Sequence, residues 1–290
     1  MLNLLQSSPV FFYTVLGILG LLVGSFLNVV IQRLPQMMEN EWREECSRLL
    51  EVKDTGGEKK EKFNLVVPRS RCPHCGHKIT ALENIPILSY LMLGGKCSEC
   101  RKSISIRYPI IELSSAVIAV FLGIHFGFGL QVLPAILLSW ALLALSVIDI
   151  DHQLLPDDIT LTFLWAGLLV NMFGIFTDVN SSLIGAMAGY GILWAVYLLF
   201  KLVTGREGMG YGDFKLLAML GAWLGWQQLP VIIILSSLCG SLVGIGLMMF
   251  RNLNKSHPIP FGPYLAAAGW ISMIWGSDIS RAYFQWALHP

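Results

Sequence analysis

Two aspartates lie at the ends of apolar segments, where charged residues are rare. Asp149 ends an apolar run that begins near Val132, and Asp213 follows the glycine-rich residues 208–212 and opens another apolar stretch. Desolvating a carboxylate at such a place costs roughly 3 kcal/mol, so it usually serves a function. Two carboxylates that meet can share one proton and act as general base and general acid, which is the arrangement of an aspartic protease. The alternative is that each aspartate only marks a helix end near the lipid headgroups.

The glycines before Asp213 favour the catalytic interpretation. Glycine lets the backbone unwind and lets an extended peptide approach closely, and unwound backbone at membrane depth is tolerated only where it lines a cavity. A protease has this requirement, because its substrate must be extended to expose the scissile carbonyl. The other acids near these segments, Asp151, Asp157, Asp158 and Glu112, are predicted to be structural or to support the site.

Four cysteines form two pairs with the spacing C-x2-C, 21 residues, C-x2-C. They are Cys72, Cys75, Cys97 and Cys100. Two such pairs supply the four thiolates of a tetrahedral zinc site, whereas a redox site needs only one pair and disulfides are disfavoured in the cytoplasm. A closed four-thiolate site predicts structural zinc, which would contribute most of the folding energy of a domain of about 45 residues. His74 and His77 are predicted to be neighbours of the metal rather than ligands.

Two glycines and a lysine directly precede the second cysteine pair. They are Gly94, Gly95 and Lys96. Such a segment could bind an anionic or carboxylate-bearing cofactor. The alternative is that the glycines only form the turn that shapes the metal-binding loop.

The composition indicates a membrane protein. Of the 290 residues, 54% are hydrophobic and 13% are charged, whereas a soluble domain carries about a quarter charged residues. Of 20 lysines and arginines, 14 lie from Arg33 to Arg107, and none lies between Tyr108 and Phe200. This uncharged stretch is predicted to be embedded in the membrane almost throughout. A net charge of +1 and the lack of a basic aromatic stripe argue against a nucleic-acid partner.

Eight apolar runs approach the length of about 20 residues that crosses a bilayer. They cover residues 10–32, 110–129, 132–150, 160–177, 183–203, 213–229, 230–250 and 264–286. The first run lacks the basic start and the cleavage site of an export signal, so it is predicted to be retained. The positive-inside rule places residues 33–108 in the cytoplasm, and counting spans onward puts both aspartates at the cytoplasmic edge.

The predicted fold is therefore an all-α polytopic membrane protein with about eight transmembrane helices. Its predicted parts are a first transmembrane helix over residues 1–34, a small zinc-stapled cytoplasmic domain over 35–108, and a seven-helix aspartic peptidase domain over 109–290. The shortest of the apolar runs, residues 213–229, barely reaches across a bilayer.

Five motifs, in this order, resemble the bacterial type IV prepilin peptidases, the bifunctional leader peptidases and N-methyltransferases of pilus and type II secretion systems. The motifs are residues 24–30 with Arg33-Leu34-Pro35, both cysteine pairs, Asp149 in Asp-Ile-Asp-His, Gly210-Tyr211-Gly212-Asp213, and residues 259–263. The Gly-x-Gly-Asp element alone also occurs in presenilin-like proteases, but the full series is specific and covers nearly the whole chain.

This resemblance implies an activity and a location. Asp149 and Asp213 would cleave the short basic leader of prepilins and pseudopilins after its final glycine, at the cytoplasmic face of the bacterial inner membrane. The family then methylates the new N-terminal amine with S-adenosylmethionine. Because the family tends to place methyl transfer in its first cytoplasmic region, Gly95 and Lys96 are the candidates for binding the methyl donor.

Three other interpretations remain open at this point. A transporter or channel could use the two aspartates to bind protons or cations, although an inverted repeat is not evident. A zinc-stapled membrane scaffold would need neither aspartate. A peptidase without methyl transfer is the third, which the intact cysteine region disfavours. Neither the oligomeric state nor the pilin-like substrates follow from the sequence.

Overall fold

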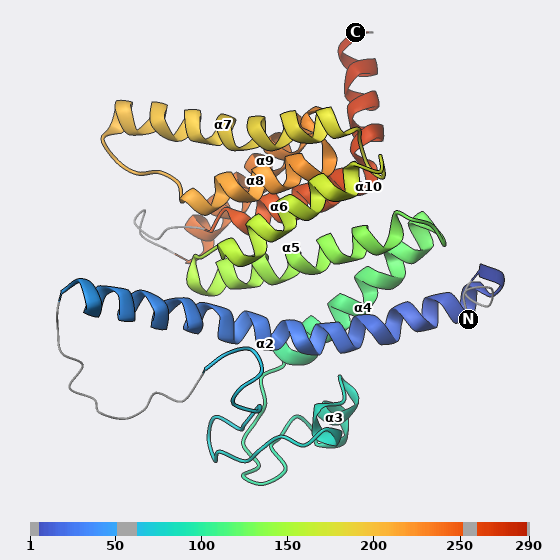
Figure 1. The fold of residues 1–290 in the computed structure, drawn as a ribbon, viewed down its shortest axis with the longest axis vertical. Helices are drawn as coiled ribbons and strands as arrows, with labels where there is room; N and C mark the ends of the chain where they lie inside the picture. Colours follow the sequence, from blue (N-terminus) through green and yellow to red (C-terminus); the bar gives the residue numbers. More distant parts are fainter. Residues whose placement is uncertain (1–5, 51–62, 252–259, 289–290) are drawn as a thin grey trace. The chain divides into compact units, whose positions relative to one another are not determined.

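The computed structural model describes residues 6–50, 63–251 and 260–288, and within these ranges it contains helices and no strands. Figure 1 shows the helices in chain order. The chain divides into two compact units, which we call the N-terminal unit, Met1–Val132, and the C-terminal unit, Leu133–Pro290. The predicted all-α class is thus confirmed for the described residues.

One long helix organises the N-terminal unit. Helix α2 (Pro9–Leu49) begins after Ser8, whose hydroxyl accepts a hydrogen bond from the Phe11 backbone, and it carries proline at its first turn, where proline is tolerated. Its 41 residues continue through Pro35, so the predicted boundary between residues 34 and 35 falls inside a continuous helix. Residues 36–62 are rich in glutamate, lysine and arginine, and their sequence favours a helix that flanks a charged loop with a turn near residues 54–57. The helix is present up to Leu49, and the turn lies outside the described residues.

Helix α4 (Arg107–Phe126) packs closely against α2. A Cβ atom on Gly20 would lie 2.5 Å from the Ala116 Cα atom, and one on Gly24 would lie 2.7 Å from the Glu112 Cα atom. The Ser115 hydroxyl donates to the Gly20 carbonyl at 2.7 Å. Small residues at this crossing therefore let the two backbones touch, as is common between membrane helices. The predicted peptidase domain over residues 109–290 includes most of this helix, whereas the structure places the helix in the N-terminal unit.

The cysteine-bearing segment of the N-terminal unit contains little regular structure. It holds a 3-10 turn, η1 (Leu82–Asn84), and a short helix, α3 (Leu88–Met92). Two isolated bridges, one between Arg71 and Lys78 and one between Lys96 and Ser103, each close a loop around one cysteine pair. Such a segment has few apolar contacts of its own, which agrees with a need for metal.

The C-terminal unit is a bundle built around a short buried helix. Its elements are α5 (Val132–His152), α6 (Asp157–Asn171), α7 (Val179–Thr204), α8 (Tyr211–Leu224), the 3-10 turn η2 (Trp226–Gln228), α9 (Leu229–Arg251) and α10 (Gly262–Leu288). Helices α6, α7 and α10 all contact α8 (Figure 1). Eleven of the 14 residues of α8 are buried, including Phe214 and Trp223, so this helix forms the core of the unit.

Each of the eight predicted spans contains a helix, but the count of eight crossings stays a prediction. Among the described residues, five helices are long and apolar enough to cross a membrane: α2, α4, α5, α7, and the stretch Trp226–Gly246, which covers η2 and most of α9. Helices α6 and α8 have 15 and 14 residues, which corresponds to about 22 Å, less than the roughly 30 Å of a hydrocarbon core. Burial inside the bundle explains why the apolar sequence of α8 did not indicate its length.

Replacing Gly185 by leucine is expected to lower the stability of the C-terminal unit. A Cβ atom on this α7 residue would overlap the carbonyl oxygen of Gly221 in α8, and overpacking of this kind typically costs about 1–3 kcal/mol. Gly191 lies on the same helix with no atom within 4 Å of its Cβ position, so Gly191→Leu is the matched control. Thermal unfolding in detergent should show a lower midpoint for Gly185→Leu than for Gly191→Leu, and equal midpoints would contradict the close crossing.

Candidate active site and metal centre

Asp149 lies in the last turn of α5 and is only 5% exposed. Its Oδ2 atom accepts a hydrogen bond of 3.0 Å from the backbone N–H of Gly262, the first residue of α10. A Cβ atom on Gly262 would lie 2.6 Å from this oxygen, so only glycine brings the backbone so near the carboxylate. Asp149 is therefore oriented by a residue 113 positions away in the chain.

This contact gives a role to the proline-rich segment before the last helix. From the sequence, residues 257–263, with three prolines, could either flank a substrate cleft or simply stop a helix. Residues 252–259 lie outside the described residues, but Pro260 and Phe261 lead directly into α10. Gly262, which follows them, belongs to the motif of residues 259–263, but sequence reasoning did not predict its contact with Asp149. Its position directly after a rigid proline-rich entry is the signal that could have indicated this contact.

Asp213 lies in the first turn of α8 and is 8% exposed. Gly210 is the N-cap residue of this helix, and the Asp213 side chain reaches back to its backbone N–H, as an acidic side chain does in a capping box. The positive end of the helix dipole also favours a carboxylate here. Residues 205–210 are not helical, in agreement with the unwinding predicted from the glycines.

The C-terminal unit brings the two aspartates together. The carboxylate of Asp149 acts electrostatically on that of Asp213. Leu155, in the turn between α5 and α6, lies against both motifs: its Cβ atom is 2.8 Å from a Cβ position on Gly212, and its Cδ2 atom is 3.2 Å from one on Gly262. Three segments that are distant in sequence thus meet around two buried carboxylates.

Among the described residues of this unit, Asp149 and Asp213 are the buried acidic residues. Two charged residues near them form ion pairs with lysines. Asp157 in α6 accepts from the Lys215 ammonium group at 2.7 Å with both oxygens, and this ion pair ties α6 to α8 two residues beyond Asp213. Glu207 pairs with Lys201 at 2.8 Å, and the pKa of Glu207 is lowered by this partner. These contacts hold the segment that leads into α8.

The four predicted zinc ligands form one cluster in the N-terminal unit. All four sulfur atoms lie within 4.8 Å of one another. The distance from Cys72 to Cys100 is 3.8 Å and that from Cys75 to Cys97 is 3.9 Å. Tetrahedral zinc with bonds of about 2.3 Å separates its sulfur ligands by about 3.8 Å. The residues present therefore fit a zinc ion.

The pKa values of three of these thiols also indicate a cation at the centre of the cluster. Backbone N–H groups of Cys75 and His74 lower the pKa of Cys72 to about 6, and those of Cys100 and Glu99 lower the pKa of Cys97. At Cys75 the His77 backbone acts in the same direction, but desolvation and the other three sulfurs raise the pKa to about 12. The backbone N–H groups of one loop can stabilise a single thiolate. Four thiolates so close together repel one another, so a positive ion between them is needed to keep all four deprotonated.

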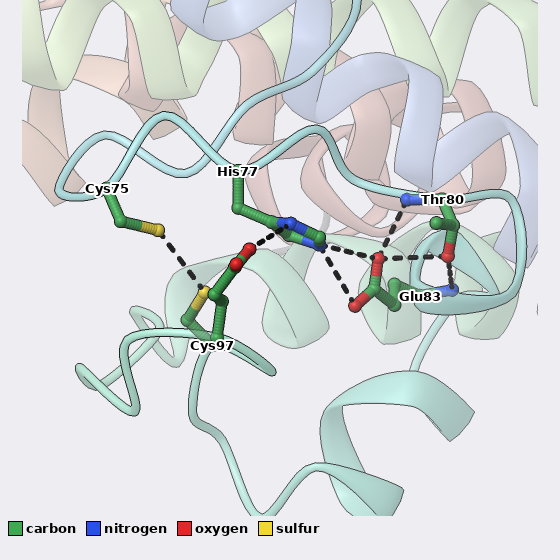
Figure 2. Close-up of polar contacts among 6 residues, drawn as sticks. Cys75, His77, Thr80, Glu83 and Cys97 are labelled. Atoms are coloured by element: carbon green, nitrogen blue, oxygen red, sulfur yellow. Dashed lines mark hydrogen bonds and ion pairs between the residues drawn. The ribbon is translucent and has the colours of Figure 1, made fainter.

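His77 lies beside the cluster and points toward Glu83, as Figure 2 shows, and two glutamates contact its ring. Its Nδ1 atom is 2.6 Å from a Glu99 oxygen, and its Nε2 atom is 3.3 Å from a Glu83 oxygen. The hydrogen bond to Glu83 raises the pKa of His77, and hydrogen bonds from Ser98 and Thr80 lower the pKa of Glu83 to about 2. Neither His77 nor His74 belongs to the group of four possible ligands, and their place beside the metal stays a prediction.

Gly95 and Lys96, the predicted donor-binding residues, belong to the turn before the second cysteine pair. Gly95 has a φ of 69°, and a Cβ atom there would lie 2.9 Å from the Tyr90 hydroxyl oxygen. Its carbonyl accepts from the Ile104 backbone at 2.7 Å, and Lys96 forms the bridge with Ser103. Both residues thus help to form the turn before the second cysteine pair. Their role in binding a methyl donor stays a prediction.

Comparisons with known proteins identify the family of this chain. The model of the bacterial peptidase A24 N-terminal domain matches residues 18–126, and that of the type IV leader peptidase family matches residues 136–245. A protein of Pseudomonas aeruginosa named prepilin leader peptidase/N-methyltransferase is 54% identical over 99% of this chain and 98% of its own length. The chain belongs to the type IV leader peptidase family.

Other relatives with the same name support this placement. One from Aeromonas hydrophila is 53% identical over 98% of this chain and 97% of its own length, and one from Legionella pneumophila is 43% identical over 97% of both. No solved structure matches the chain. The family expected from the five motifs is therefore confirmed. The four cysteines fall within the first family model and both aspartates within the second, and the gap between the models contains the border of the two compact units.

Proposed function

We propose that this chain removes the leader from type IV prepilins and pseudopilins with Asp149 and Asp213, and then methylates the new N-terminal amine with S-adenosylmethionine. The observation that carries the proposal is the meeting of two buried aspartates at helix ends in one unit. The printed names of the relatives, which join leader peptidase and N-methyltransferase, support both activities.

The two carboxylates suit hydrolysis of a peptide bond. An ionised aspartate takes a proton from water, which attacks the scissile carbonyl carbon, while the protonated partner donates to the carbonyl oxygen. Breaking the C–N bond then releases the leader and leaves a new amine. The Gly262 backbone keeps Asp149 oriented for this task, and the non-helical residues 205–210 leave room for an extended substrate beside Asp213.

The depth of the aspartates supports a cytoplasmic site and disfavours a transporter. Asp149 is three residues from the end of α5, and Asp213 is the third residue of α8, whereas ion-coupled transporters bind near the bilayer midplane. A prepilin has an apolar helix in the bilayer and a charged leader in the cytoplasm, so its cleavage point lies at that interface. Because lysine and arginine gather before residue 108, we place the site at the cytoplasmic face of the inner membrane.

Zinc and the methyl donor belong, in this proposal, to the N-terminal unit. Cys72, Cys75, Cys97 and Cys100 would hold zinc in a closed, structural site. S-adenosylmethionine supplies the methyl group when bound. Gly95 lies in a turn against which Tyr90 packs. Gly95 and Lys96 would support donor binding by keeping this turn in shape.

The position of the cut tests the peptidase directly. A purified prepilin incubated with this protein in detergent should yield a mature chain whose first residue follows the glycine that ends the leader, as read by tandem mass spectrometry. Cleavage at scattered positions, or at none, would contradict the proposed substrate class.

Gly262→Val is expected to reduce leader cleavage at least about tenfold. The added side chain would meet the Asp149 Oδ2 atom at 2.6 Å and the Leu155 Cδ2 atom at 3.2 Å, and displacing a catalytic group by about 1 Å can cost a hundredfold. Initial rates on a prepilin measure the effect. Gly191→Val, which adds the same side chain into open space, should keep the normal rate, and an equal rate for the Gly262 variant would show that its contact with Asp149 does not matter.

A further inference from the structure

A cavity of about 540 Å³ lies within the N-terminal unit, and neither aspartate is among its lining residues. Its lining comes from α2, the loops around both cysteine pairs, α3 and the first turns of α4. The cavity is partly open to its surroundings, and small-molecule sites measure about 300–1,000 Å³. The cavity therefore has the size of a site for a nucleoside-sized ligand.

The lining offers groups of three kinds. The aromatic side chains are Phe63, Tyr90 and Tyr108, the basic ones are Arg33, Arg69, Arg71 and Lys102, and the acidic ones are Glu83 and Glu112. Aromatic faces suit a purine ring, arginines suit a carboxylate, and an acid suits a cation or a pair of hydroxyl groups. S-adenosylmethionine carries all of these: an adenine, a ribose, a carboxylate, an ammonium and a sulfonium group.

Arg33 is held at the cavity in a fixed position. Its guanidinium group donates to the Asn64 carbonyl at 3.0 Å and lies 5.8 Å from the centre of the Phe63 ring. A guanidinium has five N–H donors, so these contacts orient the group and leave donors for a ligand. Preorganisation of this kind lowers the entropy cost of binding.

Glu112 is the buried charge in this lining, at 8% exposure. Its Oε2 atom accepts from the Ile87 backbone at 2.8 Å, and the Ser25 hydroxyl also bonds to the carboxylate. A carboxylate has about four acceptor sites, so two contacts leave capacity for a ligand. Burying such a group is costly unless it has partners, and a second charge or donor from a ligand would complete the set.

The partner of Glu112 is itself unusual. Ile87 has a φ of 60° and a ψ of −48°, and the Leu88 backbone N–H donates to the Pro86 carbonyl across it. This is a classic γ-turn, a strained conformation that is rare for a β-branched residue. Backbone strain of this kind concentrates at functional sites, and here it directs an N–H group at the one buried carboxylate of the cavity.

We infer that this cavity is the S-adenosylmethionine site, with Glu112 as the residue that accepts hydrogen bonds from the adenosyl or amino group of the donor. The inference rests on the proposed methyl-transfer function and gives it a place. Gly95 and Lys96 do not line the cavity, whereas Tyr90, which packs against Gly95, does. Gly95 and Lys96 would therefore act on the donor indirectly, and Tyr90 directly.

Direct binding of tritiated S-adenosylhomocysteine tests the inference without relying on turnover. Equilibrium dialysis of the purified full chain in detergent should show that Glu112→Gln weakens binding at least about tenfold, because a hydrogen bond to a charged group is lost. Ser89→Trp, which fills the cavity from another wall, should weaken it as much. Glu39→Gln, at an exposed acid of α2 that does not line the cavity, should bind like the unaltered protein.

Zinc content and leader cleavage report whether each variant is folded. If Glu112→Gln loses zinc, the Ser89→Trp result decides the question. Normal binding in both cavity variants would overturn the inference and leave the proposed function intact. If the unaltered protein cleaves prepilin but binds no S-adenosylhomocysteine, the methyl-transfer half of the proposed function fails and this site fails with it.

Discussion

Asp149→Asn and Asp213→Asn should each reduce leader cleavage at least about a thousandfold. General acid–base catalysis contributes about a hundredfold to ten-thousandfold in rate, and an amide can neither take a proton from water nor donate one as an acid. Both side chains are buried and their carboxylates interact, so neither loss can be compensated by the other group. Initial rates on a purified prepilin in detergent measure the effect.

Asp158→Asn is the matched control for this pair. Asp158 is an exposed acid in the first turn of α6 of the same unit, and its amide variant should cleave at the normal rate. Removing a buried carboxylate also removes a desolvation cost, so the Asp149 and Asp213 variants should unfold at the same temperature as the unaltered protein or higher. An active Asp213 variant would mean that the two aspartates do not form a catalytic pair.

Replacing any one of Cys72, Cys75, Cys97 or Cys100 by serine should release zinc and unfold the loops around the cysteine pairs. Binding free energies of structural zinc are about 10–16 kcal/mol, far more than the small apolar core of this segment can supply. Metal analysis should fall from about one zinc per chain toward zero, and limited proteolysis should begin to cut between residues 63 and 105. Methyl transfer should be lost, while cleavage by the C-terminal unit should persist.

Cys239→Ser provides the control for this second prediction. Cys239 is a free, exposed cysteine of the C-terminal unit, so its replacement should leave zinc and protease resistance unchanged. Purified unaltered protein that contains no zinc would end the metal assignment. A cysteine variant that loses zinc and cleavage together would instead show that the two units depend on each other.

Local patterns predicted which cysteines come together and where the backbone unwinds, because each pattern acts over a few positions. The spacing of the cysteines indicated four ligands of one ion, and the structure places all four sulfurs together. The glycines before Asp213 indicated an unwound entry, and α8 begins only at Tyr211. Apolar runs located a helix for every predicted span.

Contacts between distant segments could not be predicted in this way. The Gly262 backbone reaches Asp149 across 113 positions, and the Ile87 backbone reaches Glu112 across 25. Neither contact leaves a periodic or compositional signal, since each depends on how the helices pack. The continuity of α2 up to Leu49 was not predicted for a different reason: the sequence favours a helix beside a charged loop after residue 35, but a fall in hydropathy marks the end of a membrane span and does not show that the same helix continues into water.

The most direct measurement is intact-mass analysis of a prepilin incubated in detergent with this protein, with and without S-adenosylmethionine. We expect loss of the leader in both samples, a further methyl mass only when the donor is present, and neither change with the Asp213→Asn variant. An uncut prepilin, under conditions in which the relative from Pseudomonas aeruginosa cleaves it, would show that Asp149 and Asp213 do not form a leader peptidase.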